Sequence, residues 1–472
     1  MGKSLNLLRG SPARFTTAYH HILPSSYAVD SLVLLLQSVI ADSAFKEFGQ
    51  VGYAKALTIA VYVGMFTGAL FWGFSADMIG RRYAFNFSLF ICSVSTIVSG
   101  GMPTWASLGV WIALIGFGAG GNLILDTTVF LEYLPGDKQW VLTLMAMWWG
   151  FGQAVTGFIA WGFLVPEQWN CASVGDCTRG NNMGWRYVMF ASGTLVLVMS
   201  ILRVTIIHLL ETPKYLLANG EDVRVIETFQ HLAVKYNRRC SLTLDHLDAC
   251  GVVRGTHSRS KHRLSLGETL VHLRGLFSTR KIAISTALIW LSWTMVGLAY
   301  PLFYVFLPSY LDSRGASFEL SDYERWRNYA LTNVSAIFGP VLAGFMCNIP
   351  LLGRRFTMLI GAFLTAAFFF AYTSVRTPYQ DVGFSCAIAF CLNIYYGTLY
   401  AYTAEVLPSA HRATGNGIAV ACNRIMGILS AVIATVADTS TSVPLYICGA
   451  LLVAMGIVSA SFPFEPYGMR SS

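Results

Sequence analysis

Two short motifs of this chain occur twice at one fixed offset, and each copy lies between hydrophobic segments. The tripeptide Gly80-Arg81-Arg82 recurs 273 residues later as Gly353-Arg354-Arg355. At the same offset, Glu132-Tyr133-Leu134-Pro135 recurs as Glu405-Val406-Leu407-Pro408. Two unrelated motifs with a shared offset indicate a duplicated half with about six membrane helices per copy. Parallel halves around a midplane site are a common architecture of secondary transporters, so the repeat predicts an alternating-access carrier.

The composition requires most of the chain to lie in a membrane. Hydrophobic residues make up 55% of it, charged residues only 12%, and the mean hydropathy is +0.55. Apolar runs of about 20 residues recur, which is the length of a helix that crosses the hydrocarbon core. Helices are favoured because they satisfy every backbone group inside lipid, and the alternating pattern of a membrane barrel is absent. The expected spans are residues 22–41, 54–75, 83–101, 105–127, 139–163, 184–208, 282–309, 326–348, 355–374, 379–402, 413–437 and 442–462.

These spans predict an all-α polytopic membrane protein with twelve transmembrane helices in two six-helix halves. The first span is the weakest, because Pro24 opens it and Asp30 lies in its middle, and eleven spans is the alternative. The predicted organisation is a cytosolic tail (1–21), a first bundle (22–208), a cytosolic basic loop (209–281), a second bundle (282–462) and a cytosolic tail (463–472).

The net charge of +8 is distributed as expected for a membrane protein and does not indicate nucleic-acid binding. Inner segments hold 22 Lys and Arg residues and outer loops hold 8, so both termini are predicted to be cytosolic. The basic loop is either a linker helix on the inner leaflet or a regulatory, partner-docking segment. Cys171 and Cys177 lie in an outer loop, where an oxidising environment would permit a disulfide, and the sequence leaves this pairing open.

The loop after the second span reads GFSADMIGRR and combines Gly73, Asp77, Gly80, Arg81 and Arg82. The glycines permit close helix approach and a tight turn. The acid lies at the C-terminal end of its helix, where the helix dipole disfavours a negative charge, so it needs compensation from outside. The arginines can supply it, which predicts a cytosolic gate that breaks when the halves rock apart. The alternative is that the arginines only anchor the chain at the inner leaflet.

These residues resemble a known family over nearly the whole chain. The segment GFSADMIGRR is similar to the signature loop of the major facilitator superfamily. Glu405, Pro408 and Arg412 resemble the E-x-x-P-x-x-x-R signature of its sugar and organic-ion porters, and Glu211-Thr-Pro-Lys-Tyr-Leu resembles their segment after the sixth helix. The segments GFGAGGNLILD and AYPLFYVFLPSYL are more similar to the synaptic-vesicle-protein and organic-ion branch, including its fungal members. The resemblance implies the major facilitator fold and solute transport.

The chain departs from the family pattern in two places. Asn348 stands where the second signature loop usually has an acid, which predicts that the second gate lacks its charge latch. In the first half Lys138 replaces the arginine that usually follows the glutamate motif of Glu132. A lysine lacks the bidentate fork of arginine, so we expect a less rigid contact there.

Charged residues inside the spans are costly, about 2.5–3.5 kcal/mol at the centre of a helix on insertion scales, so each is a functional candidate. Asp30 suits a proton-coupling site, with a charge pair to a buried cation as the alternative. Arg424 is halfway along the eleventh span and is either a ligand for a substrate carboxylate or a structural partner. We expect Arg203 to extend its head group to the inner interface. Asp126 is close to that interface and has either a structural or a functional role.

By the same resemblance, the first, fourth, seventh and tenth helices line the transport cavity. A cavity with aromatic and amide groups suits a small organic solute, while each such group alone could equally be packing. The polar and aromatic candidates on these helices are Gln37, Asn122, Tyr300, Tyr304, Asn393, Tyr396 and Tyr400, with Trp290 and Trp293.

The sequence therefore predicts a proton-coupled carrier for a small organic ion, with a carboxylate or zwitterion slightly favoured. The sequence contains no metal-ligand cluster, phosphate-binding loop or nucleophile-elbow motif, so we expect no enzyme activity, no metal and no cofactor. The expected partners are the solute, a coupling proton and the lipid bilayer, with no nucleic acid, and the expected unit is a monomer in the plasma or another membrane. The alternatives are an efflux carrier for a fungal metabolite and a non-transporting sensor or scaffold with this fold.

Overall fold

The structure is a computed structural model. It describes residues 23–49, 53, 55–133, 138–171, 174–207, 211, 216–217, 220–235, 240, 242–249, 266–313, 320–408, 411–436 and 441–466. The first half contains α2 (Leu23–Glu47), α3 (Ala56–Ile79), α4 (Arg81–Ser99), α5 (Trp105–Tyr133), α6 (Trp140–Met145), α7 (Met147–Leu164) and α8 (Gly184–Leu202). The second half contains α13 (Arg280–Ser313), α14 (Asp322–Cys347), α15 (Gly353–Tyr372), α16 (Pro378–Val406), α17 (Arg412–Val436) and α18 (Val443–Ala460).

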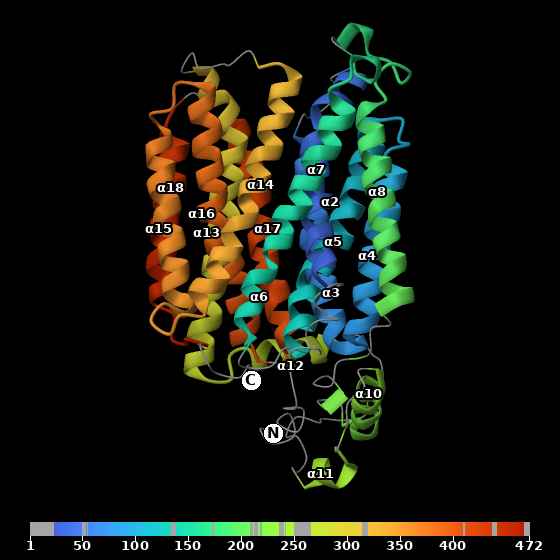
Figure 1. The fold of residues 1–472 in the computed structure, drawn as a ribbon, viewed down its shortest axis with the longest axis vertical. Helices are drawn as coiled ribbons and strands as arrows, with labels where there is room; N and C mark the ends of the chain where they lie inside the picture. Colours follow the sequence, from blue (N-terminus) through green and yellow to red (C-terminus); the bar gives the residue numbers. More distant parts are fainter. Residues whose placement is uncertain are drawn as a thin grey trace.

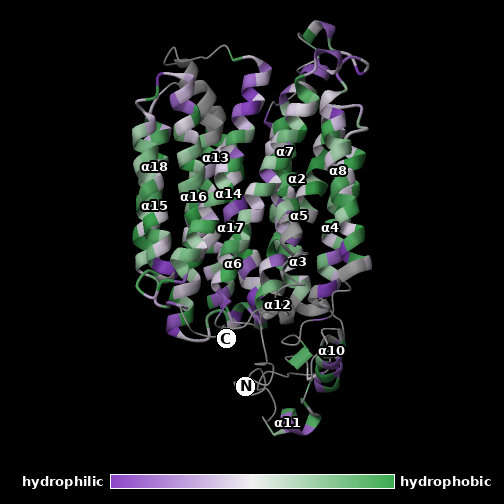
Figure 2. Ribbon diagram, viewed as in Figure 1, coloured by the Kyte–Doolittle hydropathy of each residue, from purple (hydrophilic) through white to green (hydrophobic). Residues whose placement is uncertain are grey.

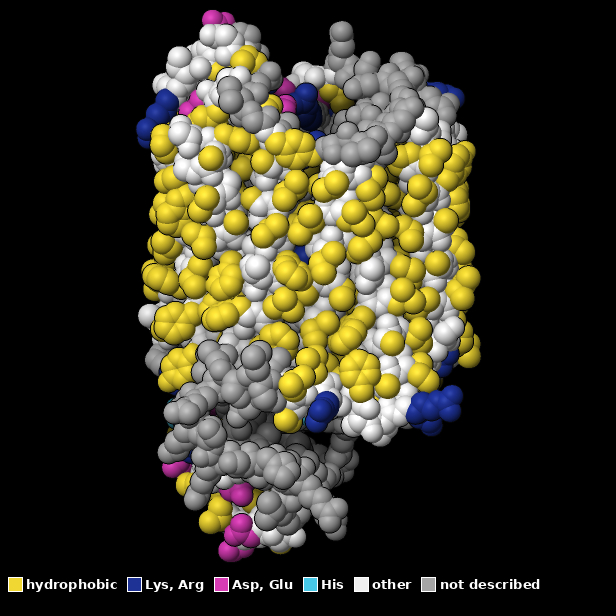
Figure 3. Space-filling model, turned by 180° about the vertical axis from the view of Figure 1, so that it is seen from behind, with side chains coloured by type: hydrophobic (Ala, Val, Ile, Leu, Met, Phe, Trp, Pro, Cys, Tyr) yellow, Lys and Arg dark blue, Asp and Glu magenta, His cyan; other side chains and the backbone are white. Residues whose placement is uncertain are grey.

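The helices form a membrane bundle. Ten of them are long and apolar enough to cross a bilayer. Two further units lie beside them, α4 and the nearly continuous pair α6 and α7, which completes the predicted twelve (Figure 1). These two are less apolar because α4 begins with two arginines and α7 is rich in tryptophan and glycine. Apolar residues run through the middle of the helices (Figure 2), and apolar side chains form a belt around the visible face (Figure 3).

The first span is one continuous helix of 25 residues, which removes the eleven-span alternative. Pro24 lies in the first turn of α2, where a missing backbone N–H breaks no helical hydrogen bond. The helix therefore carries Asp30 into the protein interior, where 2% of this residue is exposed.

The two halves meet mainly along two helix pairs, α3 with α17 and α7 with α14, and α5 and α6 also contact the second half. Near the C-terminal end of α3, Gly73 lies so close to α17 that a Cβ atom there would be 3.1 Å from the Cα atom of Gly417. Nearby, the Asn416 amide donates to the Thr127 hydroxyl at 3.1 Å. At the second pair, Gly157 of α7 lies equally close to the backbone of Ala330 in α14. Small residues thus bring the halves into direct contact at both ends.

The loop between the halves contains α10 (Asp222–Lys235), α11 (Leu244–Asp248) and α12 (Leu266–Gly275), all at the lower end of the bundle in Figure 1. Leu216, Val225, Leu242 and Leu247 form a small core of its own within this loop. The last helix, α12, contacts the start of α17, where the Nδ1 atoms of His272 and His411 are 2.8 Å apart. Burial, together with the neighbouring His272, lowers the pKa of His411 to about 4, so this contact holds the imidazole neutral.

Candidate substrate and coupling site

A buried polar network joins three helices of the first half. The Asn122 side-chain nitrogen donates to Asp30 Oδ1 at 2.6 Å and to Asp126 Oδ2 at 3.4 Å. The Asn122 side-chain oxygen accepts from Arg203 Nη1 at 2.9 Å. None of these four residues is more than 5% exposed. One amide therefore connects two acids on one side with one guanidinium on the other.

The position of Arg203 corrects the prediction that its head group extends to the interface. The side chain is buried instead, donates to the Phe85 carbonyl oxygen at 3.1 Å and lies over the Phe85 ring at 3.8 Å. The ring face and the carbonyl solvate the cation, and nearby acids provide opposite charge. The first bundle thus holds its own cation against Asp30 and Asp126.

An aromatic cluster separates this network from the second half. The Trp149 ring on α7 lies 5.9 Å from Tyr27, 5.4 Å from Tyr396 and 4.4 Å from Tyr400. The Trp293 ring on α13 covers the other side of Tyr400, at 4.5 Å. Trp149 and Tyr27 were absent from the sequence candidates, because a tryptophan in an apolar helix gives no signal that separates it from packing. The cluster brings the rings of both halves together.

Arg424 lies on the second-half side of this cluster. It is 8% exposed, and its Nε atom is buried without a hydrogen-bond partner. Its charge acts on the phenol groups of Tyr62 on α3 and Tyr396 on α16. No ion pair joins it to an acid within the described residues. It is therefore a buried cation that neutral phenol groups surround.

The remaining cavity candidates mostly have structural partners. The Gln37 side chain accepts from Thr58 at 3.1 Å, which joins α2 to α3, and the Asn393 amide donates to the carbonyl oxygen of Ala389 on its own helix at 2.8 Å. The Trp290 indole donates to the Gly415 carbonyl oxygen at 3.3 Å. Tyr300 packs on the main core, and the side chain of Tyr304 lies outside the described residues.

The second repeat of the gate motif holds a buried ion pair. Arg354 Nη2 is 3.0 Å from Glu405 Oε1, and both side chains are at most 3% exposed. The backbone N–H groups of Arg354 and Arg355 donate to the two carboxylate oxygens of Glu465 at 3.0 and 3.1 Å. Arg412 is also buried and carries its charge close to Glu405. The ion pair joins α15 to α16 within the second half, so the absence of a charge latch between the halves at the second gate stays a prediction.

The first repeat has the same backbone arrangement. Gly80 has a φ of 101°, and the Arg82 backbone N–H donates to Glu211 Oε2 at 3.4 Å. Gly353, its repeat, has a φ of 55°. Glu211 and Glu465 thus cap corresponding helices, and each follows the last span of its half. The side chains of Asp77, Arg81 and Glu132 lie outside the described residues.

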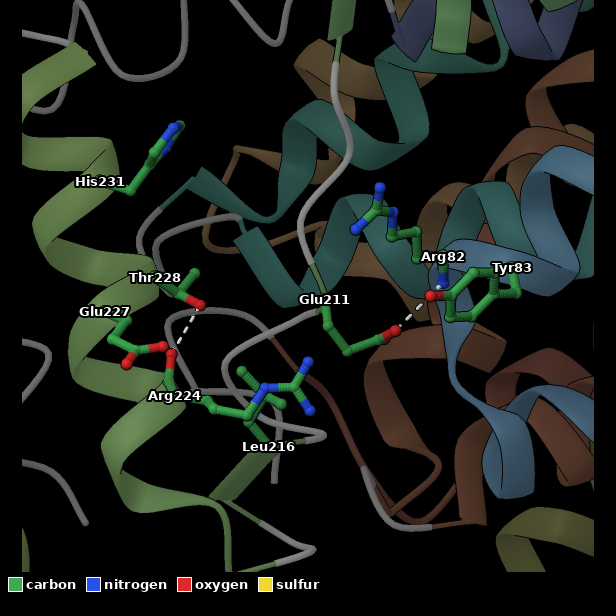
Figure 4. Close-up of a pocket in the computed structure, with 8 residues that line it drawn as sticks. All are labelled: Arg82, Tyr83, Glu211, Leu216, Arg224, Glu227, Thr228 and His231. Atoms are coloured by element: carbon green, nitrogen blue, oxygen red, sulfur yellow. Dashed lines mark hydrogen bonds between the residues drawn. The ribbon is translucent and has the colours of Figure 1, made fainter. Parts of the chain in front are cut away.

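A cavity of about 330 Å³ lies beside the first gate, between α10 and the start of α4 (Figure 4). Glu211 and Arg82 line its bundle side, and Arg224 and His231 come from α10. Arg224 pairs at 2.5 Å with Glu221, the residue just before α10, and this contact raises the pKa of Arg224. Acids and bases line the cavity together, so its walls favour neither anions nor cations.

The first half has two further cross-links at the end of the bundle where α2 ends and α8 begins. Cys171 and Cys177 form a disulfide with their Cα atoms 5.3 Å apart. Arg186 on α8 pairs with Glu47 at the end of α2 at 2.5 Å, and its guanidinium also donates to the carbonyl oxygens of Gly100 and Met102. Neither Arg186 nor Glu47 was among the residues predicted from the sequence.

Removal of the arginine of the second gate should destabilise the protein strongly. Arg354→Met leaves the Glu405 carboxylate buried next to fewer cations, a change that costs about 3–5 kcal/mol at comparable sites. The exposed pair of Arg325 and Asp322, at 3.7 Å, provides the matched control. We expect Arg354→Met to lower the Tm of the purified protein in detergent and Arg325→Met to leave it almost unchanged. Equal Tm values for the two variants would contradict the role of the buried pair.

The chain is similar to known membrane transporters. The family model described as Major Facilitator Superfamily matches residues 25–431. The MFS siderochrome iron transporter 1 of Ceriporiopsis subvermispora is 38% identical over 94% of this chain and 86% of its own length. The niacin transporter NiaP of Acinetobacter baylyi is 27% identical over 79% of this chain and 76% of its own. The structure of the proton:xylose symporter XylE bound to 6-bromo-6-deoxy-D-glucose has a TM-score of 0.72 at 16% identity, covers 98% of both chains and shows the same fold.

Proposed function

Because the chain belongs to the major facilitator superfamily, whose matched relatives are transporters and not enzymes, we propose that it carries a small organic acid together with a proton. The protein is an integral, multi-pass membrane protein, and we place it in the plasma membrane. It would work as a monomer by alternating access, since the duplicated halves enclose the site and meet at both ends.

The observation that carries the proposal is Arg424, which has no acid partner among the described residues. A guanidinium without an acid partner in the membrane interior is costly, and a carboxylate from a solute would offset that cost through charge-assisted hydrogen bonds. The Tyr62 and Tyr396 hydroxyls beside it can donate to or accept from the same solute. The site is thus suited to an organic anion.

The rings around the cation favour a solute with an aromatic or otherwise planar body. Trp293, Tyr396 and Tyr400 lie within 5.7 Å of one another, ring centre to ring centre, and the charge of Arg424 acts on both tyrosines. Such rings stack on a flat solute, while the guanidinium fixes the carboxylate. Niacin, the solute named for one of the relatives, has both features and is the first compound to test.

Asp30 supports proton coupling. It is buried beside Asp126 and faces the aromatic cluster that separates it from Arg424. An acid in this position can take up a proton when the site is open to one side and lose it when the site is open to the other. The two halves then each provide one function, the proton site in the first and the anion site in the second.

A second candidate substrate is an iron-siderophore complex. The relative with 38% identity is named as a siderochrome iron transporter, and an anionic chelate would also be attracted to Arg424. Such a complex is larger than niacin and would use more of the aromatic surface.

Uptake of labelled solutes tests the proposal. Cells that express the full chain would receive niacin, its uncharged amide, a ferric siderophore or an organic cation, with and without a protonophore. We expect niacin to accumulate, its amide to be ignored and the protonophore to abolish accumulation. Uptake of the siderophore alone would favour the second candidate. Equal uptake of the acid and its amide would overturn the anion site, and no flux in cells or inverted vesicles would favour a sensor or scaffold.

A further inference from the structure

Two tryptophans pack edge-on against Tyr400, and they differ in their hydrogen bonding. The Trp149 ring lies 4.4 Å from the Tyr400 ring, and the Trp293 ring lies 4.5 Å from it. The Trp293 indole donates to the Thr403 hydroxyl at 3.0 Å, whereas the Trp149 indole nitrogen is buried and has no acceptor among the described residues. A buried indole N–H normally has a partner, and a buried donor without one is unfavourable. Trp293 is therefore satisfied inside the protein, and Trp149 is not.

Other tryptophans show that this chain satisfies its indoles elsewhere. The indole nitrogens of Trp72, Trp185 and Trp290 donate to protein oxygens at 3.1, 2.7 and 3.3 Å. Trp148 also lacks an acceptor in the described part of the chain, but its ring packs on Phe151 at 5.0 Å and not on the tyrosines of the cluster. An unpartnered indole that touches those tyrosines is thus a property of Trp149.

The backbone of Trp149 is held firmly in place. The Ser31 hydroxyl donates to the Trp149 carbonyl oxygen at 2.7 Å, which ties α7 to α2. The next residue, Gly150, lies so close to α14 that a Cβ atom there would be 2.7 Å from the backbone nitrogen of Ile337. Trp149 therefore comes from the first half at a point where that half contacts the second, and its position is fixed before a solute arrives.

Trp149 and Arg424 approach the same two tyrosines from different halves. The Trp149 ring lies 5.4 Å from Tyr396 and 4.4 Å from Tyr400, and the charge of Arg424 acts on both phenols. A flat acid placed against these rings would have the guanidinium for its carboxylate and the indole for the rest of its body. Such a solute would contact α7 and α17 together and so join the two halves.

The chemistry of the indole decides which group of the solute it can bind. An indole nitrogen donates a hydrogen bond and cannot accept one, so its partner on the solute must be an acceptor. The Tyr27 hydroxyl beside it is also buried without a partner in the described structure, but a phenol both donates and accepts and therefore does not select between the two. The unpartnered indole thus favours a solute with an acceptor apart from its carboxylate.

We propose that Trp149 is a specificity-determining residue whose indole N–H binds a hydrogen-bond acceptor on the planar body of the carried acid. This inference rests on the proposed function and narrows its substrate class to acids that have such an acceptor, for example the ring nitrogen of niacin. An acid of the same shape without the acceptor leaves the indole unsatisfied, so the site discriminates against it.

Calorimetric binding of niacin and of benzoate to the purified full chain, in detergent at neutral pH, tests the proposal. The two acids have the same shape and charge, and only niacin has a ring nitrogen. We expect the protein to bind niacin about tenfold more tightly, the difference that one hydrogen bond of this kind makes. Trp149→Phe should abolish this preference. Trp148→Phe removes an unpartnered indole from the same helix and should keep the preference, which makes it the matched control.

Raman difference spectra of the unaltered protein provide a second measurement that needs no variant. An indole N–H band should shift when niacin binds and stay in place when benzoate binds. A Trp149→Phe variant that weakens both acids equally and keeps the preference would show a structural role and overturn the proposal. Equal affinity of the unaltered protein for both acids would overturn it while the anion site stands. Binding of neither acid would overturn the proposed function and this inference with it.

Discussion

Arg424→Gln is expected to abolish uptake of the organic acid and, at the same time, to raise the Tm of the protein. The variant removes the charge-assisted contact with the carboxylate, and loss of one partner of a buried charge pair costs about 100-fold in affinity or more. It also removes a buried cation that has no acid partner within the described residues, and thereby relieves an unfavourable burial. Initial uptake rates at several solute concentrations and thermal unfolding in detergent measure the two effects.

The direction of the stability change separates a substrate ligand from a structural residue. A structural arginine would lower the Tm when it is removed, as predicted for Arg354→Met. Arg424→Lys should recover part of the uptake, because lysine keeps the charge but lacks the planar fork. Arg325→Gln, at an exposed position, should change neither uptake nor Tm. A lower Tm together with normal affinity would show that Arg424 is structural.

Asp30→Asn is expected to stop accumulation of the solute against a gradient while exchange of solute across the membrane continues. An amide has the shape of the protonated acid but cannot release a proton, so the carrier can still bind and rock without using the proton gradient. Preloaded vesicles measure exchange, and the same vesicles with an imposed pH gradient measure accumulation. The expected loss of accumulation is complete.

The exposed acid Asp322 provides the control for this experiment, since Asp322→Asn alters a residue that forms only an exposed ion pair. Accumulation that persists in Asp30→Asn would place the coupling site elsewhere or exclude proton coupling. Loss of both exchange and accumulation would show that Asp30 binds the solute or supports the fold. The Tm of the Asp30→Asn variant would distinguish a role in solute binding from a role in the fold.

The fold was largely predictable because lipid imposes length and apolarity on every span. The repeats around Gly80 and Gly353 indicated two halves, and the structure contains the predicted helices in that arrangement. The first membrane span was uncertain in the sequence because proline and aspartate, here Pro24 and Asp30, are both unfavourable in a transmembrane helix. A proline in the first turn costs little, and Asn122 on a distant helix satisfies the acid. Sequence composition along one segment cannot show such a partner.

The site was only partly predictable. Asp30 and Arg424 were found because charges inside spans are rare. The prediction for Arg203 was wrong. The residue is close enough to the inner end of its span to reach the interface, but its hydrogen-bond partners Phe85 and Asn122 lie on other helices and hold it inside the protein. Glu465 was missed for a similar reason, although Glu211 occupies the corresponding place after the first half and was the available signal.

Direct detection of proton movement with the solute tests the central claim. Proteoliposomes of the full chain would contain a pH-sensitive dye and receive niacin, or the acid identified by uptake, at equal pH on both sides. We predict faster internal acidification than in empty liposomes, and Asp30→Asn and Arg424→Gln should each reduce it to the level of empty liposomes. Entry of the labelled acid without additional acidification would contradict proton-coupled transport by this protein.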